Sequence, residues 1–411
     1  MILGALLLVS SATAVPLAHS FSNTLSQAGL FGVNGNRKRL TFDPHGNFKV
    51  VSFSDMHFGE GEDVTWGPEQ DVNTSIAHAH ILDKEKPNYV VFNGDLITGE
   101  NVYADNATKY LDQVFAPTVA RKIPFSSTHG NHDNTLAINH QEEIEYEQAH
   151  YSALSYTRSD VGPKPYGSGN YWVPVYASKN DPVPAVVMWF FDSRSFVSGN
   201  PAGPGPVPPE ADVYWVDEKT VPQYIKQQRA LMLRTWKKVL PALVFVHIPV
   251  NLPSLEPTVE QETQHRLSQV QKADVLAPLP SAGDHDDEPD PATQGFLNNT
   301  YTGRDLPFWN ALVDMDGGHG TVLAVTSGHD HGESWCARAT ASSGIPICFN
   351  GHSGYGGYVT AHSAVRNGRV FGLNLRDLAR EVPVVRTWNS YENGTVNEEV
   401  VLGPDYMPEF N

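Results

Sequence analysis

One arrangement recurs six times in this sequence: an apolar run of strand length is followed at once by Asp, His or a Gly that precedes one of them. The runs are 48–54, 89–93, 123–128, 185–191, 242–246 and 322–327. In open α/β sheets, functional sites lie beyond the carboxyl ends of the strands. Side chains that follow several strands can therefore meet at one edge. Asp, His and Asn together suit divalent transition metals, so the pattern predicts a metal site at that edge.

Seven residues after these runs are candidate metal ligands. They are Asp55, His57, Asp95, Asn131, His247, His329 and His331. Asp95 follows Gly94 at a tight turn, and a carboxylate has two oxygens, so Asp95 can bridge two ions. Two ions about 3.5–4 Å apart form the clamp used for in-line displacement at phosphorus. The ligand count is sufficient for such a pair.

His132 is not among the candidate ligands and lies next to one of them, Asn131. It is free to act as a general acid on a leaving oxygen or to stabilise phosphoryl oxygens. Asp133 could hydrogen-bond that imidazole and fix its orientation. His132 and Asp133 are therefore the candidate catalytic residues.

Helical stretches are expected between the apolar runs, at 74–86, 107–121, 139–151, 221–239 and 306–313. Their alternation with the runs predicts an α/β fold with a partly parallel sheet covered by helices. From residue 321 short strands dominate and end near Leu375. The expected organisation is a lead at 19–46, one domain at 47–380 and a C-terminal extension at 381–411. The insertion 251–295 contains the acidic stretch 284–288, which is a second metal site or a solvated loop.

The ordered motifs resemble the calcineurin-like metallophosphoesterase superfamily. They are Asp55–His57, Gly94-Asp95, Gly130–Asp133, His247 and Gly328–His331. The resemblance implies a four-layer α/β/β/α sandwich of two mixed sheets. It also implies one ion on Asp55, His57, Asp95 and His331, and a second on Asp95, Asn131, His247 and His329. His132 would be the catalytic histidine.

The stretches 54–62, 93–101 and 351–358 resemble the purple-acid-phosphatase-related branch, which includes fungal Dcr2-type phosphatases. True purple enzymes carry a tyrosine three residues after the bridging Asp, where this chain has Thr98, and they lack the counterpart of His57. A tyrosine-ligated ferric ion is therefore not expected. The expected cofactors are two divalent transition metal ions: Mn, Zn or Fe.

Composition and the N-terminus bear on partners and compartment. The net charge of −18 over 411 residues disfavours a nucleic-acid partner, because binding a polyanion requires clustered Lys and Arg. Residues 1–18 predict a signal peptide, with an N-terminal membrane anchor as the alternative. No later stretch has the ~18 apolar residues that a membrane span needs. The expected location is the secretory pathway, extracellular or vacuolar.

Two kinds of residue agree with that compartment. Four sequons predict glycosylation, at Asn73, Asn106, Asn298 and Asn393. Cys336 and Cys348 flank a Ser-Ser-Gly turn and could form a disulfide across a hairpin, the alternative being two buried free thiols.

Three functions remain open. The first is a phosphoesterase, most simply a phosphomonoesterase in which a metal-bound hydroxide attacks a phosphorylated small molecule or protein. The second is a phosphodiesterase or nuclease on the same fold. The third is a non-catalytic binding protein on that fold.

Overall fold

The computed structural model describes residues 37–61, 66–161, 167–195, 214–251, 294–297, 300–338, 344–360 and 363–406. The predicted signal peptide 1–18, residues 19–36 of the lead, the sequon residue Asn298 and the acidic stretch 284–288 lie outside these ranges. Among the helices within them, none has the length and apolar character to cross a membrane.

The first sheet is mixed, with strand order β14–β13–β12–β1–β2–β3. Its parallel half runs through β1 (Asn47–Phe53), β2 (Tyr89–Asn93) and β3 (Phe125–Thr128). Its antiparallel half continues from β1 into β12 (Asn367–Asn374), β13 (Val385–Tyr391) and β14 (Val396–Leu402).

The second sheet has the order β10–β11–β9–β6–β5–β4 and is also mixed. Its four central strands are parallel: β5 (Pro184–Phe191), β6 (Ala242–Val246), β9 (Val322–Ser327) and β11 (Pro346–Phe349). The antiparallel strands β4 (Tyr171–Tyr176) and β10 (Cys336–Arg338) form its edges. A separate small hairpin pairs β7 (Phe296–Leu297) with β8 (Thr300–Tyr301).

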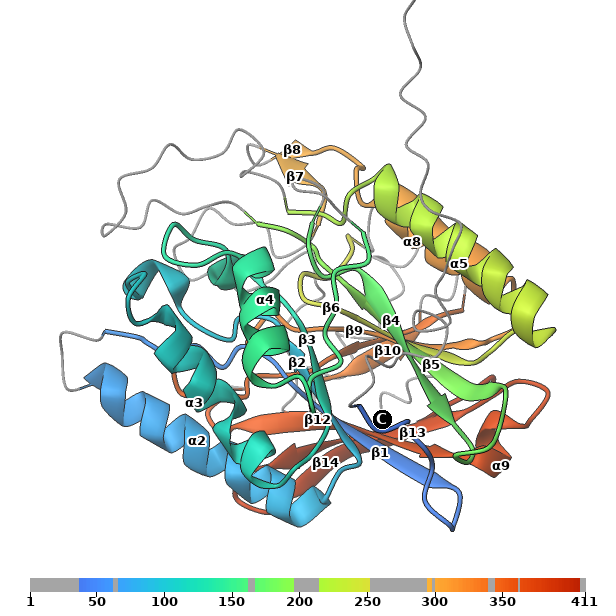
Figure 1. Cartoon of the computed structure of the whole chain (residues 1–411), viewed down its shortest axis with the longest axis horizontal. Helices are drawn as coiled ribbons and strands as arrows, with labels where there is room; N and C mark the ends of the chain where they lie inside the picture. The colour runs from blue at the N-terminus through green and yellow to red at the C-terminus, as the bar shows by residue number, and fades with distance from the viewer. Residues whose placement is uncertain are drawn as a thin grey trace, which may run out of the picture.

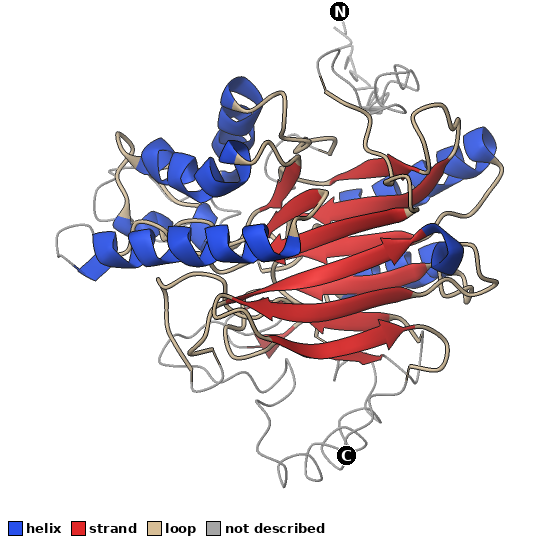
Figure 2. Ribbon diagram, turned by 90° about the horizontal axis from the view of Figure 1, so that it is seen from below, coloured by secondary structure: helices blue, strands red, loops and turns tan. Residues whose placement is uncertain are grey.

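Helices lie on the two outer sides of the paired sheets. Figure 1 shows α2 (Trp66–Glu85), α3 (Ala107–Ala120) and α4 (His140–His150) on the side of the first sheet. On the other side, α5 (Thr220–Trp236) and α8 (Leu306–Asp316) lie together beyond β4 and β5. Figure 2 shows the strands side by side with these helix groups to either side, and the short α9 (Leu375–Leu378) follows β12. Helix α2 begins at Trp66 rather than at the predicted Thr74, because Pro68 is compatible with a first helical turn.

The alternation of side chains along β5 establishes the layers. Met188 and Phe190 pack in the cluster between the two sheets, whereas Trp189 and Phe191 pack in the cluster with α5 and α8. Successive strand residues point to opposite faces, so β5 is covered on both. Burying each such side chain stabilises the fold by about 1.5–3 kcal/mol. A third cluster joins the first sheet to α2 and α3. The predicted four-layer α/β/β/α sandwich of two mixed sheets is confirmed.

The sheet continues past the point where strands were expected to end. Strands were predicted to stop near Leu375, with an extension from 381, but β13 and β14 form the edge of the first sheet up to Leu402. Edge strands of antiparallel sheets face solvent on one side, and Val396 and Val401 of β14 are indeed exposed. Such strands carry many polar residues, and this weakens their sequence signal.

The structure joins Cys336 of β10 and Cys348 of β11 by a disulfide, with their Cα atoms 4.1 Å apart. The two residues are direct partners in the antiparallel pair. The bridge therefore closes the segment that follows the candidate ligands His329 and His331.

Three predicted glycosylation residues lie within the described ranges. Asn73 is partly exposed on α2, Asn106 precedes α3 and accepts a hydrogen bond from the Tyr103 amide, and Asn393 is exposed between β13 and β14. Their glycosylation remains a prediction.

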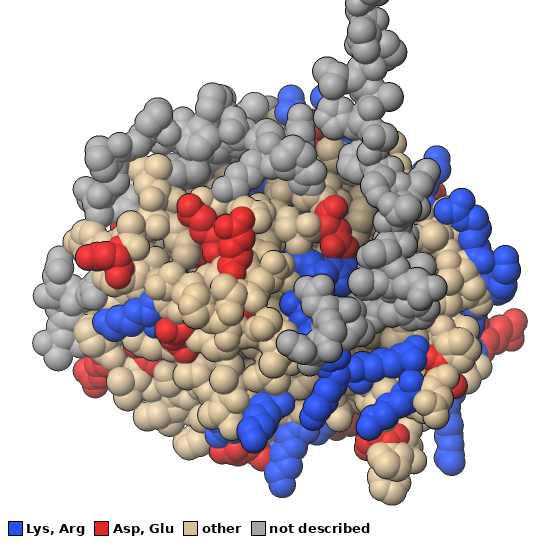
Figure 3. Space-filling model, viewed as in Figure 1, with Lys and Arg blue, Asp and Glu red and all other residues tan. Residues whose placement is uncertain are grey.

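Charged side chains are unevenly spread over the face drawn in Figure 3. Basic groups gather in its lower right part, and acidic groups lie both over its upper part and among the basic ones. On this face the described residues therefore form no continuous basic surface.

Candidate metal centre

The carboxyl ends of strands from both sheets converge on one site. Asp55 and His57 follow β1, Asp95 follows β2 and Asn131 lies in the short helix η2 (Asn131–Asp133) after β3. From the second sheet, His247 follows β6, while His329 and His331 follow β9. Three overlapping groups form here, each with ligand atoms within 4.8 Å of one another. They are Asp55–His57–His331, His57–Asp95–His132 and Asp95–His247–His329.

Four of the candidate ligands have left-handed backbones. The φ angles are 55° at Asp55, 47° at His57, 49° at Asp95 and 73° at His329. This region costs a residue with a Cβ roughly 1–3 kcal/mol, and such strain concentrates at functional sites. The strained turns direct the side chains at the strand ends into one space.

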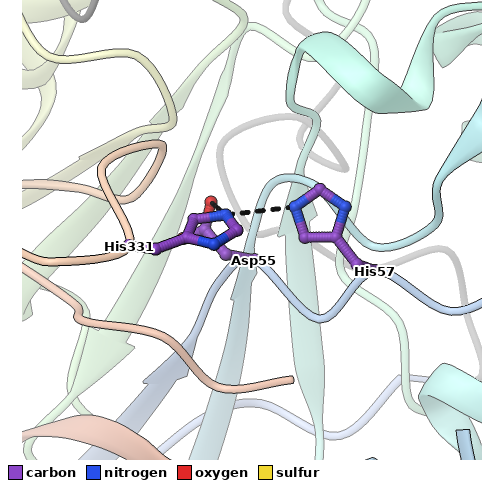
Figure 4. Close-up of side chains that lie close together, drawn as sticks. All are labelled: Asp55, His57 and His331. Atoms are coloured by element: carbon purple, nitrogen blue, oxygen red, sulfur yellow. Dashed lines mark hydrogen bonds and ion pairs between the residues drawn. The ribbon is translucent and has the colours of Figure 1, made fainter. Parts of the chain in front are cut away.

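The first histidine pair is held unusually close. The Nε2 atoms of His57 and His331 lie 3.2 Å apart, and the His331 Nε2 lies 3.5 Å from the Asp55 carboxylate. Figure 4 shows the two rings pointing toward each other, with Asp55 behind His331. The His331 Nδ1 is 2.7 Å from the Tyr358 carbonyl, which can only accept, so Nδ1 carries the proton in the neutral ring. The Nε2 lone pair of His331 then faces His57.

Asp95 is positioned to serve both halves of the site. Its Oδ2 lies 3.7 Å from the His57 Nε2 and 3.0 Å from the His247 Nε2. The His247 Nδ1 donates to the Asn93 carbonyl at 2.8 Å, so its Nε2 is directed at Asp95. The other oxygen of Asp95 accepts from the His132 amide. One carboxylate thus faces an imidazole from each sheet.

The pKa values show how these charges interact. Burial alone would raise the pKa of Asp95, but the imidazoles of His247, His132 and His57 hold it well below its usual range. Burial lowers the pKa of His57 and of His329 to about 3. The opposite holds for His247, where attraction to Asp95 and Asp55 outweighs burial and raises the pKa to about 9. At neutral pH the Asp95 carboxylate is thus ionised and the His57 and His329 imidazoles are neutral, which are the forms that bind metal, whereas His247 would release its proton on binding a metal ion.

The donor set fits cations on further grounds. Within the described part of the chain, the buried Oδ1 of Asn131 has no hydrogen-bond partner. A buried amide oxygen left unpaired is costly, and a cation would satisfy it. A cation between His57 and His331 would likewise use the two lone pairs that face each other.

His132 is partly open to solvent, with 31% of its side chain exposed. Its Nδ1 contacts Glu100 of the short helix η1 (Gly99–Asn101). Burial would lower its pKa, but the carboxylates of Glu100 and Asp95 hold it well above the usual range. His132 is thus protonated over a wide pH range and open to a bound molecule.

The expected role of Asp133 is wrong. Its carboxylate accepts from three backbone amides, those of Leu96, Ile97 and Gly130, at 2.8, 3.1 and 2.7 Å. It therefore fixes the loops after β2 and β3, and Glu100 takes the place beside the His132 ring.

Several further residues support the ligands, although the sequence had assigned none of them that role. Tyr358 stacks its ring on His331 with centroids 4.0 Å apart, and His352 lies at the same centroid distance on the other side. Glu60 and Thr98 form a hydrogen-bonded pair beside His57. All of them, and Glu100, belong to the stretches 54–62, 93–101 and 351–358, so their proximity to the motifs was the available signal.

Comparisons with known proteins agree with this geometry. The sequence model of the family described as calcineurin-like phosphoesterase matches residues 48–353. The chain is 26% identical over 364 residues to the phosphatase Dcr2 of Saccharomyces cerevisiae, covering 86% of this chain but only 56% of that protein. It is 26% identical over 385 residues to the probable inactive purple acid phosphatase 29 of Arabidopsis thaliana, covering 87% and 85% of the two chains.

Solved structures of similar fold include a dimetal phosphatase from Danio rerio. That match has a TM-score of 0.49 and 15% identity, and covers 88% of this chain and 99% of the other. A purple acid phosphatase from yellow lupin matches with a TM-score of 0.45 and 12% identity, covering 88% and 54%.

Proposed function

The chain belongs to the calcineurin-like phosphoesterase family, and from that premise we propose that it hydrolyses phosphate monoesters at a site holding two divalent metal ions. The observation that carries the proposal is the position of Asp95. Its Oδ2 lies 3.7 Å from the His57 Nε2 and 3.0 Å from the His247 Nε2, as expected of a ligand shared by two ions.

We assign each half of the site one ion. One would be held by Asp55, His57, Asp95 and His331, and the other by Asp95, Asn131, His247 and His329. The short distance between the His57 and His331 nitrogens and the unpaired Asn131 oxygen support this division. Imidazole and carboxylate ligands suit Mn²⁺, Zn²⁺ or Fe²⁺. When bound, such ions would neutralise phosphoryl oxygens and activate water for in-line attack.

His132 is the residue we assign to the leaving group. Its Nδ1 is engaged by Glu100, so its Nε2 is the atom that can donate a proton to the departing oxygen. The raised pKa keeps that proton in place at neutral pH. Glu100 acts through His132 as a positioning residue.

The substrate is proposed to be a phosphorylated small molecule or phosphoprotein. The net charge of −18 gives a nucleic-acid backbone little to bind. Signal-peptide cleavage and a secreted or vacuolar location complete the proposal, and the disulfide is consistent with an oxidising compartment.

A second candidate is a protein that binds the ions without catalysis. Relatives from Arabidopsis thaliana bear names that call them probable inactive purple acid phosphatases. His132 lies beside the ligands, is engaged by Glu100 at its Nδ1 and is left free to act on a substrate, which favours the enzyme.

The test is a screen of metals against substrates. Purified chain is stripped with a chelator, reloaded with Mn²⁺, Zn²⁺ or Fe²⁺, and assayed on nitrophenyl phosphate, bis-nitrophenyl phosphate and a phosphopeptide. Metal-dependent hydrolysis of the monoester, lost in Asp95→Asn, would support the proposal. Preference for the diester would move it to a phosphodiesterase. Two bound ions with no hydrolysis of any substrate would favour the binding protein.

A further inference from the structure

We propose that Glu60 is a positioning residue for one metal ion, because it fixes the proton on His57 through Thr98 and anchors the segment that orients His331. This inference rests on the proposed two-metal function and concerns residues that prepare the site for metal binding. Glu60 follows the first motif but is not itself a ligand in our assignment.

The proton on His57 is set by a chain of two hydrogen bonds. The Thr98 hydroxyl lies 2.7 Å from the Glu60 Oε1, and an ionised carboxylate can only accept, so the hydroxyl proton goes to Glu60. The His57 Nδ1 lies 2.9 Å from the same hydroxyl oxygen. Since the hydroxyl has no second proton, Nδ1 must donate to it. The Nε2 of neutral His57 is then bare and faces the site.

The same carboxylate anchors the glycine-rich segment 351–358. The Glu60 Oε1 accepts from the Gly357 amide at 3.1 Å, and Oε2 accepts from the Asn101 side chain at 3.1 Å. Residue 358 comes next along the chain, and its carbonyl receives the Nδ1 proton of His331. Glu60 thereby helps to orient both His57, through Thr98, and His331, through the segment 351–358. The Nε2 atoms of these two rings lie 3.2 Å apart.

The packing leaves no room for a side chain at position 357. The φ of Gly357 is +68°, and an added Cβ would lie 2.6 Å from the His331 ring and 2.9 Å from the His57 ring. The segment therefore touches both imidazoles directly. Thr98 is 4% exposed and the Glu60 side chain 14%, so water competes little with this network.

A misplaced proton would disable the site. If His57 carried its proton on Nε2, the N–H would point at the His331 Nε2 and at the cation position between them. Partners that fix the tautomer of a ligating histidine typically change metal affinity by about 10–100-fold when removed. Glu60 and Thr98 therefore govern one ion, while the His247 side of the site has its own partner in the Asn93 carbonyl.

The test compares Thr98→Val, which keeps the shape of the side chain, with Thr98→Ser, which keeps the hydroxyl. A matched control is Thr118→Val. Thr118 is buried and bonds the His78 Nε2 at 3.1 Å, so it forms the same kind of Thr–His pair outside the site. Glu60→Ala and Glu60→Gln form a second pair, because glutamine retains an acceptor for Thr98.

Two readouts are used on the full chain. Chelator competition with Zn²⁺ should show one of the two ions bound about 10–100-fold more weakly in Thr98→Val and Glu60→Ala. The affinity of these two variants for the other ion should not change. Thr98→Ser, Glu60→Gln and Thr118→Val should bind both ions with affinities close to those of wild type. Imidazole ¹⁵N shifts of the metal-free chain should show the His57 proton on Nδ1 in wild type and redistributed to Nε2 in Thr98→Val.

The outcomes separate two failures. If wild type binds two ions but Thr98→Val weakens neither, or no more than Thr118→Val, the inference about Glu60 is overturned and the proposed function stands. An unchanged His57 tautomer in Thr98→Val would overturn it as well. If wild type does not bind two ions, the proposed function itself fails.

Discussion

Replacing Glu100 by glutamine should weaken catalysis through His132 without removing metal. Glutamine has nearly the same shape but no charge, so the change isolates the electrostatic part of the contact between Glu100 and the His132 Nδ1. Glu100 contributes the largest attraction that keeps the pKa of His132 raised. Its loss should therefore lower that pKa.

The size of the effect follows from charge and exposure. Two unit charges about 4 Å apart interact by about 4 kcal/mol at an effective dielectric of about 20. Exposed pairs give typically less than about 1 kcal/mol, and the side chains here are 31% and 28% exposed, so we take about 1–2 kcal/mol. One pKa unit is about 1.4 kcal/mol. The His132 pKa should fall by about one unit.

The expected kinetics follow from the sign of that shift. A general acid must carry its proton, so activity falls as the pH rises through its pKa. The alkaline limb of the profile of kcat/KM should therefore move to lower pH by about one unit in Glu100→Gln. Turnover above that pH should fall about tenfold for alkyl phosphates, which need a proton at the leaving oxygen, and much less for nitrophenyl phosphate.

The assay measures both substrates across pH, with metal content determined for each variant. Glu145→Gln is the control, since Glu145 is an exposed carboxylate on α4 that bonds only Gln141 among the described contacts. An equal loss on good and poor leaving groups would refute the general-acid role. A loss of metal in Glu100→Gln would instead show that Glu100 belongs to the ligand set.

Four further outcomes are expected. Elemental analysis should find two ions per chain in wild type and none in Asp95→Asn, and retention of one ion would refute bridging. Loaded protein should show no visible charge-transfer band, because threonine stands three residues after Asp95; a strong band would mean that a tyrosine reaches the metal. Reducing Cys336–Cys348, which closes a loop with a sequence separation of 12, should cost roughly 3 kcal/mol or less and weaken metal retention, as thermal unfolding and chelator competition would show. His140 and Asp192 form a buried ion pair 3.1 Å apart, in which the pKa of His140 is raised and that of Asp192 is lowered. The pair therefore makes its full contribution to the free energy of unfolding between about pH 4 and 6.5, and this contribution fades as the pH rises through the folded pKa of His140. Asp192→Asn should thus lower Tm more at about pH 5.5 than at about pH 9, and an equal loss would contradict the assignment.

The central strands were predictable because their sequence signal is physical. Parallel strands buried on both faces read as unbroken apolar runs, and the predicted bounds of β2, β6 and β9 coincide with those of the structure. Once the end of each strand is predicted, the residues just beyond it are placed too, and these include Asp95, His247 and His329. By contrast, β13 and β14 lie toward the antiparallel edge of the first sheet, contain many polar residues and were not predicted as strands.

The partners of the site residues were harder to predict than the residues themselves. Asp133 follows His132 in the sequence, but a short helix turns its carboxylate away to three backbone amides. Glu100 is 32 residues from His132 and reaches it only because η1 and η2 lie together. Hydrogen-bond partners depend on how loops fold over the strand ends, and residue spacing carries no information about that.

Thr98 shows how two departures from the purple enzymes become one structural change. Those enzymes have a tyrosine at this position and lack the counterpart of His57. In this chain the Thr98 hydroxyl oxygen lies 2.9 Å from the His57 Nδ1, and the hydroxyl donates a hydrogen bond to Glu60. Thr98 is 4% exposed, so a larger side chain at this position would have to displace its neighbours, one of which is the His57 ring. In our assignment, position 98 after β2 supports a ligand that comes from β1, whereas in the purple enzymes it holds the tyrosine itself. This relation could not be read from either motif alone, since it depends on the loops after the neighbouring parallel strands β1 and β2 meeting at one end of the sheet.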